Sequence, residues 1–434
     1  MQKKKIKKWE KIFIIMSIII IFIIIGVYAY RLVFYYKKTN IIPENAKLKD
    51  VITNQVNIVY SGDGLYKIDD YNYYYMGKEV SNYLYYSGRM WRIISIDNIG
   101  IKIITDNSES SLVWGNNTNY LESNVYKWLN EDKFLNSISN NDKIVSTKWC
   151  NTAIDINDYK CETTTEAKVG LLTIDEYIKS GGVNSYLNNE TYFWTLNIDT
   201  NNKAYYVHSE GGINNEVSMD TLFYSYGIRP VIYIDNNTPF ISGKGTIEDP
   251  YIIDSNQEIM INNHSVGSYL TYQNYTWRIM EITDNYTLLV LDGYIEDNDK
   301  KPIKLSYAKA LNYLNNEFLN TLKKDNLVKF DYDITEYSNT SSYNYQKVKE
   351  KQTNYVTLPK VGDLFINDYS GNWLNSYDSI KEKLIYTTSK ENTLFADLSS
   401  SENYLRPIIA ISNGLIIASG DGTKNKPYIV GDTK

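Results

Sequence analysis

A stretch near the middle of the chain, residues 226–234, returns in altered form at residues 404–411. Each copy leads into a similar tail, which reads Gly-Thr-Ile-Glu-Asp-Pro-Tyr at 245–251 and Gly-Thr-Lys-Asn-Lys-Pro-Tyr at 422–428. A repeat of this kind indicates a duplicated structural unit, since each copy carries the same pattern of apolar and turn residues. The duplication therefore constrains the fold more than any other feature of the sequence.

Each copy also contains the residues Trp-Arg-Ile at the start of a β-hairpin pattern, ahead of the Arg-Pro stretch. Alternating and β-branched residues follow each Trp-Arg pair, and turn residues separate them from a second apolar run, which predicts a hairpin. The arginines before proline are interpreted as buried, hydrogen-bonded structural groups. The expected structural core of the two repeats comprises Trp91, Arg92, Arg229, Pro230, Trp277, Arg278, Arg406 and Pro407.

An amphipathic helix is expected after each hairpin. In the second copy, apolar residues recur at helical spacing over 307–322, with Ser306 as the cap. The first copy carries one extra residue, which would rotate its apolar stripe by about 100°. This helix is therefore expected to be broken or bulged near Glu131. Further along, Thr173 and Glu176 form a predicted capping box.

The order Trp-Arg-Ile, Trp-Leu-Asn, Val-Gly-Leu-Leu-Thr-Ile-Asp-Glu-Tyr, Phe-Trp-Thr and Gly-Ile-Arg-Pro-Val-Ile in the first copy resembles a bacterial extracellular domain family of unassigned function. That family is distantly similar to the C-type-lectin-like fold of formylglycine-generating (sulfatase-modifying) enzymes. The resemblance covers about residues 60–240 well and 265–412 more loosely. It implies an α+β fold with two loop-rich, C-type-lectin-like domains of mostly antiparallel strands and flanking helices.

The N-terminal region predicts a membrane segment. Residues 12–30 are uncharged and rich in isoleucine, and at about 1.5 Å per residue they would span roughly 28 Å. The lysines that precede this run place the N-terminus in the cytoplasm. A cleaved signal peptide is the alternative, because Val27 and Ala29 have the small-residue pattern of a cleavage site. The protein is expected at the cell membrane, single-pass, with its C-terminal domains extracellular and the lipid bilayer as a partner of 12–30.

The expected organisation follows from these features. Residues 1–36 would form a basic tail and transmembrane helix, and 37–57 a polar stalk. Residues 58–254 would form repeat one and 255–434 repeat two. The formal net charge of −6 lies unevenly, because residues 1–38 carry nine Lys or Arg and one Glu, which leaves a net charge of −14 on the rest of the chain. Nucleic acid is excluded as a partner on this basis, because phosphate binding needs clustered positive charge.

Few residues are suited to catalysis or metal binding. The chain has two Cys and two His, too few for a typical zinc site, and it lacks nucleophile-elbow, P-loop and dinucleotide motifs. His208, near Glu210, could act in acid–base chemistry, but a surface strand histidine is the preferred interpretation. The acidic residues 292–299 could attract calcium, yet they lack EF-hand spacing, so a solvated turn is preferred. We expect no cofactor and no enzymatic activity.

Cys150 and Cys161 are expected to form a disulfide that closes a short loop outside the cytoplasm. The alternatives are an oxygenase-type cysteine pair, as in formylglycine-generating enzymes, and two unpaired thiols. The cysteines lie in the middle of the first repeat, whereas the enzyme pair lies near the end of its fold, which favours the structural disulfide.

Aromatic residues supply the remaining functional signal. The expected ligand-binding residues lie near loops that carry ligands in lectin-like folds: Trp194, Tyr205, Tyr206 and Tyr224. The sequence therefore favours a surface binding or adhesion module for a glycan, a cell-wall polymer or a protein. The alternatives are an enzyme with the sulfatase-modifying-like fold or a wall-modifying hydrolase, and a structural spacer. The shape and polarity of the largest cavity should distinguish them.

Overall fold

The computed structural model describes most of the chain. The described residues are 2–39, 43, 45–115, 119–151, 161–199, 203–214, 224–254, 260–337, 346–364, 369–381, 383–389 and 391–431. Within the first helix, side chains are described only for residues 9, 12, 13 and 15–31.

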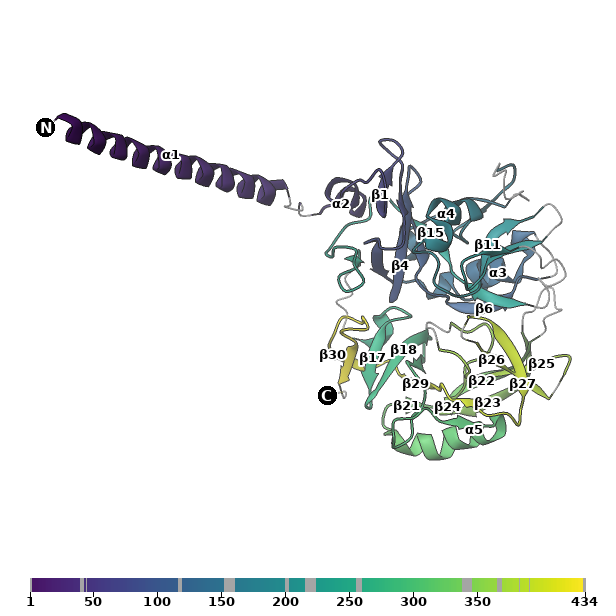
Figure 1. Ribbon diagram of the computed structural model, residues 1–434. Coiled ribbons are helices and arrows are strands. Elements are labelled where there is room, and N and C mark those ends of the chain that lie inside the picture. Colours follow the sequence, from purple (N-terminus) through teal and green to yellow (C-terminus); the bar gives the residue numbers. More distant parts are fainter. Residues whose placement is uncertain are drawn as a thin grey trace.

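Strands dominate the structure, which is 39% strand and 20% helix and contains several sheets (Figure 1). The expected α+β class is therefore wrong, and the protein is mostly β. The reason is that the amphipathic segments make only short α-helical stretches before they change to tighter or wider turns. The α-helices are α1 (Gln2–Thr39), α2 (Leu48–Gln55), α3 (Asn124–Lys127), α4 (Ile174–Lys179) and α5 (Tyr307–Tyr313).

The isoleucine-rich run that predicts a membrane segment lies in α1. Among the residues whose side chains are described, no helix is both long enough and apolar enough to cross a membrane. For the described part of the chain, the prediction of a transmembrane helix over 12–30 is wrong. The predicted single-pass membrane localisation depended on this helix and is therefore wrong as well.

The segment expected as a stalk contains α2, which packs on the first repeat. Leu48 and Ile52 are fully buried and Val51 nearly so, which gives this short helix one apolar face toward the core. The backbone N–H of Leu48 donates to the carbonyl of Thr238 at 3.0 Å. The chain therefore joins the globular part well before residue 58.

Repeat one is built on a nine-stranded sheet around the predicted hairpin. The hairpin strands β4 and β5 pair antiparallel, and the Arg-Pro strand β15 pairs with β5, which gives the order β1-β2-β4-β5-β15-β10. Outside this path, β3 pairs with β4, β16 pairs with β3, and β7 pairs with β15. The strands are β1 (Gly64–Lys67), β2 (Tyr73–Met76), β3 (Tyr83–Tyr86), β4 (Arg89–Ile96), β5 (Ile101–Thr105), β7 (Ile144–Val145), β10 (Val169–Gly170), β15 (Val231–Ile234) and β16 (Tyr251–Ile252).

Repeat two has an eight-stranded sheet with the corresponding pairings, in the order β21-β29-β19-β18-β17-β31-β30, with β24 on β29. Both hairpins carry a β-bulge two residues after the tryptophan, between Ile93 and Ser95 in β4 and between Ile279 and Glu281 in β18. The strands are β17 (Tyr269–Tyr272), β18 (Tyr275–Ile282), β19 (Tyr286–Leu291), β21 (Leu327–Val328), β24 (Val356–Thr357), β29 (Ile408–Ser412), β30 (Ile416–Ser419) and β31 (Tyr428–Gly431).

A second sheet completes each repeat. The order is β13-β12-β11-β14-β6 in repeat one and β23-β22-β25-β26-β27 in repeat two, beside the small pairs β20-β28 and β8-β9. These strands are β6 (Ser110–Val113), β8 (Thr147–Cys150), β9 (Thr164–Ala167), β11 (Phe193–Ile198), β12 (Ala204–Val207), β13 (Ile213–Asn214), β14 (Ser225–Ile228), β20 (Lys304–Leu305), β22 (Phe330–Tyr337), β23 (Lys347–Asn354), β25 (Trp373–Asp378), β26 (Leu384–Thr388), β27 (Leu394–Leu398) and β28 (Asn403–Tyr404).

One tryptophan has the same role in both second sheets. The indole N–H of Trp194 in β11 donates to the Leu112 carbonyl at 2.8 Å, and that of Trp373 in β25 donates to the Leu305 carbonyl at 2.7 Å. By apolar pattern alone, residues 192–195 would be matched with 384–387 in β26, but the tryptophan bonds match β11 with β25, the strand beside it.

The repeated tryptophans and arginines occupy matching buried positions. Trp91 donates its indole N–H to the Tyr86 carbonyl at 2.9 Å, and Trp277 donates to the Tyr272 carbonyl at 3.1 Å. Both rings are fully buried. These bonds satisfy the one polar atom of each ring and fix the ring across the hairpin.

The arginines before proline tie each Arg-Pro strand to its hairpin. Arg229 Nε donates to the Thr105 carbonyl at 3.1 Å, and Arg406 Nε donates to the Leu291 carbonyl at 2.8 Å. Each side chain is only 1% exposed, and burial lowers the pKa of both guanidinium groups to about 10. A cation buried this deeply requires fixed hydrogen-bond acceptors, so these carbonyls hold the two elements in register.

The helix of each repeat contains a wide turn. The predicted interruption near Glu131 is confirmed, since α3 passes into a π-helical turn over Trp128–Asp132. Repeat two has the same feature over Leu314–Phe318 after α5, where a regular helix was expected. The bulge is thus a property of both repeats and not of the extra residue in the first. The predicted capping box of Thr173 and Glu176 is also confirmed, at the start of α4.

An asparagine inside each wide turn explains its shape. Asn130 Nδ2 donates to the Val169 carbonyl at 3.1 Å, and the Val169 N–H donates back to Asn130 Oδ1 at 3.1 Å. Asn315 makes the same pair of bonds with Val356, at 3.0 and 3.4 Å. The side-chain amide therefore satisfies one backbone N–H and one C=O of β10 or β24, as a neighbouring strand would.

Replacing Asn130 by Ala should lower the free energy of unfolding by about 1–3 kcal/mol, since the buried Val169 N–H would lose its acceptor. The control is Asn136→Ala, because the exposed Asn136 amide makes only two long bonds to backbone carbonyls, both 3.3 Å. Urea unfolding followed by circular dichroism measures both. Equal stability of the two variants would contradict this role for Asn130.

The two repeats share one continuous hydrophobic core and are joined by buried hydrogen bonds. Trp128 donates its indole N–H to the Gly362 carbonyl at 2.8 Å, and Tyr337 accepts from the Val113 N–H at 2.8 Å. The Tyr192 N–H donates to the Glu391 carbonyl at 3.0 Å. Because several buried polar groups of one repeat are satisfied only by the other, the repeats form one packed unit in which they lie side by side (Figure 1).

Buried tyrosines make stability sensitive to alkaline pH. Burial raises the pKa of Tyr251, Tyr337, Tyr369 and Tyr428 to about 12 from 10.0. A raised pKa favours the neutral phenol in the folded state. This stabilisation is complete below pH 10, the value for the unfolded chain, and is lost as the pH rises from 10 toward 12.

We expect unfolding, followed by circular dichroism, to begin between pH 10 and 12, and tyrosinate absorbance to rise in two phases. Exposed tyrosines should titrate first, and the buried ones should titrate together with unfolding. A single tyrosinate transition that precedes any loss of circular dichroism would contradict the expectation.

Candidate functional site

The aromatic residues expected to bind a ligand are mostly inaccessible. Trp194 is 0% exposed, Tyr205 4% and Tyr206 5%. The rings of Trp194 and Tyr206 pack on Tyr226, with centroid separations of 4.7 and 4.4 Å. Only Tyr224 is exposed, at 49%. The expectation of an aromatic ligand surface here is corrected, since three of its four rings belong to the core of the second sheet.

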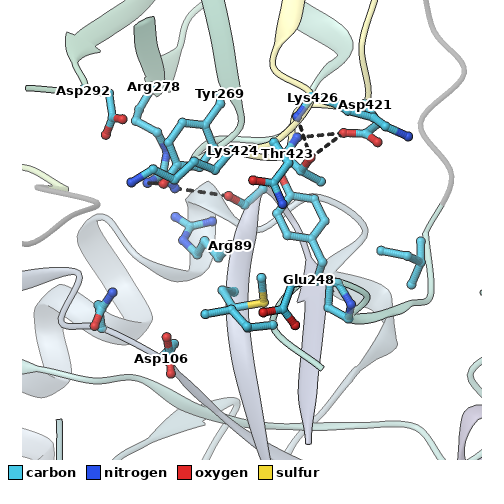
Figure 2. A pocket seen from close by; sticks show the side chains of 18 of the residues that line it. Arg89, Asp106, Glu248, Tyr269, Arg278, Asp292, Asp421, Thr423, Lys424 and Lys426 are labelled. Carbon is cyan, nitrogen blue, oxygen red and sulfur yellow. Dashed lines mark hydrogen bonds between the residues drawn. The ribbon is translucent and has the colours of Figure 1, made fainter. Parts of the chain in front are cut away.

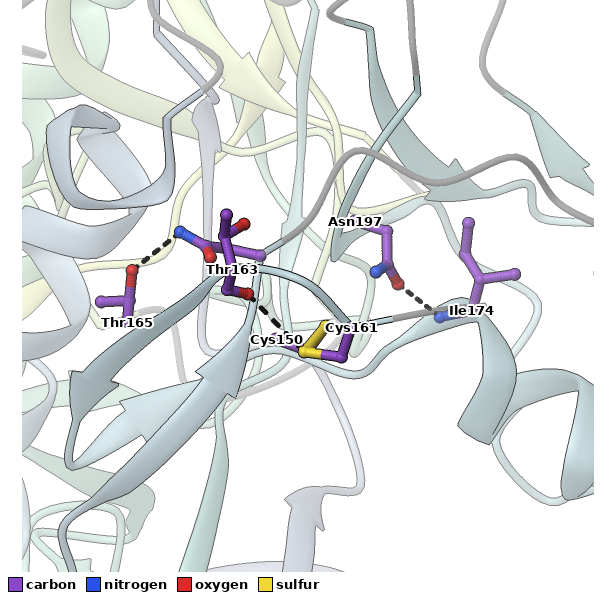
Figure 3. Close-up of a disulfide and its surroundings, with 7 residues drawn as sticks. Cys150, Cys161, Thr163, Thr165, Ile174 and Asn197 are labelled. Atoms are coloured by element: carbon purple, nitrogen blue, oxygen red, sulfur yellow. Dashed lines mark hydrogen bonds between the residues drawn. A yellow bond between two sulfur atoms is a disulfide. The ribbon is translucent and has the colours of Figure 1, made fainter. Parts of the chain in front are cut away.

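The two cysteines form a disulfide at the end of the β8-β9 hairpin (Figure 3). Cys150 is the last residue of β8, and the Cα atoms of Cys150 and Cys161 are 5.7 Å apart. Thr165 in β9 is held to Asn151 by a hydrogen bond of 2.8 Å, which places a second tie beside the disulfide. With both sulfur atoms bonded to each other, the pair has the arrangement of a structural crosslink.

The double substitution Cys150→Ser and Cys161→Ser should lower the free energy of unfolding by about 3 kcal/mol, on the chain-entropy model for a loop of this length. Urea unfolding with and without reductant measures the effect. Reductant should destabilise the natural chain by the same amount and leave the serine variant unchanged. A natural chain insensitive to reductant would contradict a stabilising disulfide.

The histidine and acidic residues weighed as chemical candidates are engaged locally. His208 Nε2 lies 2.6 Å from the Tyr192 hydroxyl, and His208 Nδ1 accepts from the Glu210 N–H at 3.1 Å. Asp297 accepts from the N–H groups of Asp299 and Lys301, both at 2.9 Å, which makes the acidic segment a turn. Within the described residues, no group of three or more His, Cys, Asp or Glu side chains could hold a metal ion.

A cavity of about 760 Å³ lies between the two repeats (Figure 2). Repeat one lines it with residues from the β3-β4 hairpin, the loop after β5 and its tail. Repeat two contributes the start of β17, β18, the residue after β19 and its own tail. We call this cavity the inter-repeat cleft. Its volume falls in the range of small-molecule and oligomer binding sites.

Tyrosines and one arginine form the inner part of the inter-repeat cleft. Arg278 lies 4.0 Å above the centre of the Tyr269 ring, and it donates to the Tyr269 hydroxyl at 3.0 Å and to the Gly88 carbonyl at 3.2 Å. Tyr85 donates to the Gly422 carbonyl at 2.8 Å. Burial raises the pKa of Tyr369 to about 12, so its hydroxyl remains a hydrogen-bond donor at neutral pH.

Most carboxylates from repeat one that line the cleft are held by cations of the same repeat. Glu109 accepts from Arg89 at 2.7 Å in a nearly fully buried pair. Asp106 lies 3.5 Å from Arg92, and Asp249 lies 3.1 Å from Lys244. Their oxygens can also accept hydrogen bonds from a ligand.

A second, smaller cavity of about 460 Å³ also lies between the repeats. Lys133 and Glu281, which line it, form an ion pair of 3.0 Å across the repeat boundary. The charged pair bridges the two repeats, so this cavity is best described as part of their interface.

Of the charged residues of the inter-repeat cleft, sequence patterns singled out only Arg278 and Asp292, although two signals mark others. Asp106 and Asp292 each directly follow the second strand of a hairpin, β5 and β19. The tails also differ between their shared Gly-Thr and Pro-Tyr, where Ile247, Glu248 and Asp249 stand opposite Lys424, Asn425 and Lys426. The structural roles expected for the repeated Trp and Arg residues agree with their buried positions, and Arg278 additionally faces the cleft.

No protein-family model, curated protein or solved structure matches the chain. The resemblance to a bacterial extracellular domain family with a C-type-lectin-like fold stays a prediction.

Proposed function

We propose that this protein is a binding module whose ligand is a glycan segment held in the inter-repeat cleft. The observation that carries the proposal is a cavity of about 760 Å³ that both repeats line with tyrosines and with charged side chains of both signs. Tyrosine rings pack against the apolar faces of sugars, while carboxylates and guanidinium groups bond their hydroxyls.

The contacts favour binding over hydrolysis. Glycoside hydrolysis requires one protonated and one ionised carboxyl group on either side of the scissile bond. Asp106, Glu109 and Asp249 are each engaged by a cation of the same repeat, so they do not form a free pair of this kind. The cleft also argues against a passive spacer, since a spacer has no need for a large cavity with convergent polar groups.

The double substitution Glu248→Ala and Lys424→Ala should weaken glycan binding by roughly 5-fold or more, because each removes an exposed charge from the cleft lining. The matched control is Lys309→Ala with Glu317→Ala, which removes the same charges from the exposed face of the helical segment, outside the cleft lining. The full chain is screened on a glycan array, and the best ligand is then measured by calorimetry.

Three outcomes would overturn the proposal. Binding that the control variant weakens as much as the cleft variant would place the site elsewhere. Binding to a protein and to no glycan would replace the ligand class. Release of sugar fragments, detected by mass spectrometry, would make the protein a hydrolase.

A further inference from the structure

The tails of the two repeats adopt the same turn. In each, a glycine with φ of +77°, Gly245 or Gly422, lies against the ring of the tyrosine that ends the motif, Tyr251 or Tyr428. The carbonyl of each glycine accepts from the first residue of a hairpin strand, Gly245 from Tyr83 and Gly422 from Tyr269, both at 2.8 Å. The residues between glycine and tyrosine therefore have matching positions in the two repeats.

The two tails line the same cleft with opposite charge. The positions that carry Ile247, Glu248 and Asp249 in repeat one carry Lys424, Asn425 and Lys426 in repeat two. Figure 2 shows Glu248 on one side, with Asp106 beyond it, and Arg278 and Lys426 on the other. The duplication has thus produced a cleft with an acidic side from repeat one and a basic tail from repeat two.

The charges at the rim are available to a ligand. Glu248, Lys424 and Lys426 are exposed, and none of them forms an ion pair with another described residue. Asp421, on the basic tail, is used within its own turn, where it accepts from the N–H and hydroxyl of Thr423 at 3.0 and 2.7 Å. Opposite charges therefore face the cleft without neutralising each other through a direct contact.

We infer that the ligand is a zwitterionic glycan, with ammonium and carboxylate groups on neighbouring sugars, and this inference rests on the proposed function. The ammonium group would face Glu248 and Asp106, and the carboxylate would face Lys424 and Lys426. A polymer with charge of one sign would meet repulsion from one side of the cleft, which gives selectivity for the zwitterion.

Four tetrasaccharides with different charged groups test the inference. The first alternates glucuronate with N-unsubstituted glucosamine and carries both charges, and its N-acetylated form carries carboxylates only. Chitosan tetraose carries ammonium groups only, and N-acetylated chitotetraose is neutral. Calorimetry with the full chain should give roughly 10-fold tighter binding of the zwitterion than of the other three, and the difference should shrink at high salt.

Charge reversals assign each side of the cleft. Lys424→Glu should weaken binding of the zwitterionic and carboxylate probes by roughly 5- to 20-fold and leave the ammonium probe unchanged or tighter. Glu248→Lys should weaken the zwitterionic and ammonium probes and spare the carboxylate probe. A merely structural effect would weaken all probes alike. Lys309→Glu and Glu317→Lys are the matched controls, and thermal unfolding checks that every variant folds.

The outcomes separate this inference from the proposed function. If the neutral or a singly charged tetrasaccharide binds in the cleft as tightly as the zwitterion, the inference is overturned and the glycan-binding proposal stands. If the folded protein binds none of the four and no glycan on the array, both are overturned.

Discussion

The buried guanidinium groups of Arg229 and Arg406 are the constraint on which the rest of the structure depends. Each cation is only 1% exposed, and each donates to the backbone carbonyl at the end of a hairpin strand. A buried cation without such acceptors would destabilise the fold strongly. The bond therefore fixes the Arg-Pro strand beside the hairpin in both repeats. It also fixes the residue that follows that hairpin carbonyl, Asp106 or Asp292, at the wall of the inter-repeat cleft.

The cleft exists because two similar units pack through surfaces that are not equivalent. Trp128 of repeat one bonds the Gly362 carbonyl of repeat two, and Tyr337 of repeat two bonds Val113 of repeat one. These contacts join the repeats tightly on one side, while the tails and hairpin ends meet around a cavity of about 760 Å³. A site assembled in this way combines side chains that neither repeat could bring together alone, which is how divergence of two copies can produce a new binding surface.

The chemistry of the cleft connects the duplication to the proposed function. The tails keep the glycine, proline and tyrosine that shape the turn, and they differ at the residues between, which line the cleft. The fold therefore sets the positions of the charges, and the side chains set their sign. An acidic side opposite a basic tail favours a ligand with both charges, since a ligand of one sign is attracted by one side and repelled by the other.

The sequence by itself determined the duplication, the two hairpins, the capping box at Thr173 and the interruption near Glu131, because these depend on patterns within short segments. Only the tertiary structure decided which aromatic rings are accessible. Trp194 in β11 and the adjacent Tyr205 and Tyr206 in β12 lie on strands expected near ligand-carrying loops, yet their rings are buried. The same holds for the cleft, whose charged residues come from segments as far apart in sequence as Arg89 and Lys426. Local periodicity reports which residues share a face, and long-range packing decides whether that face is buried.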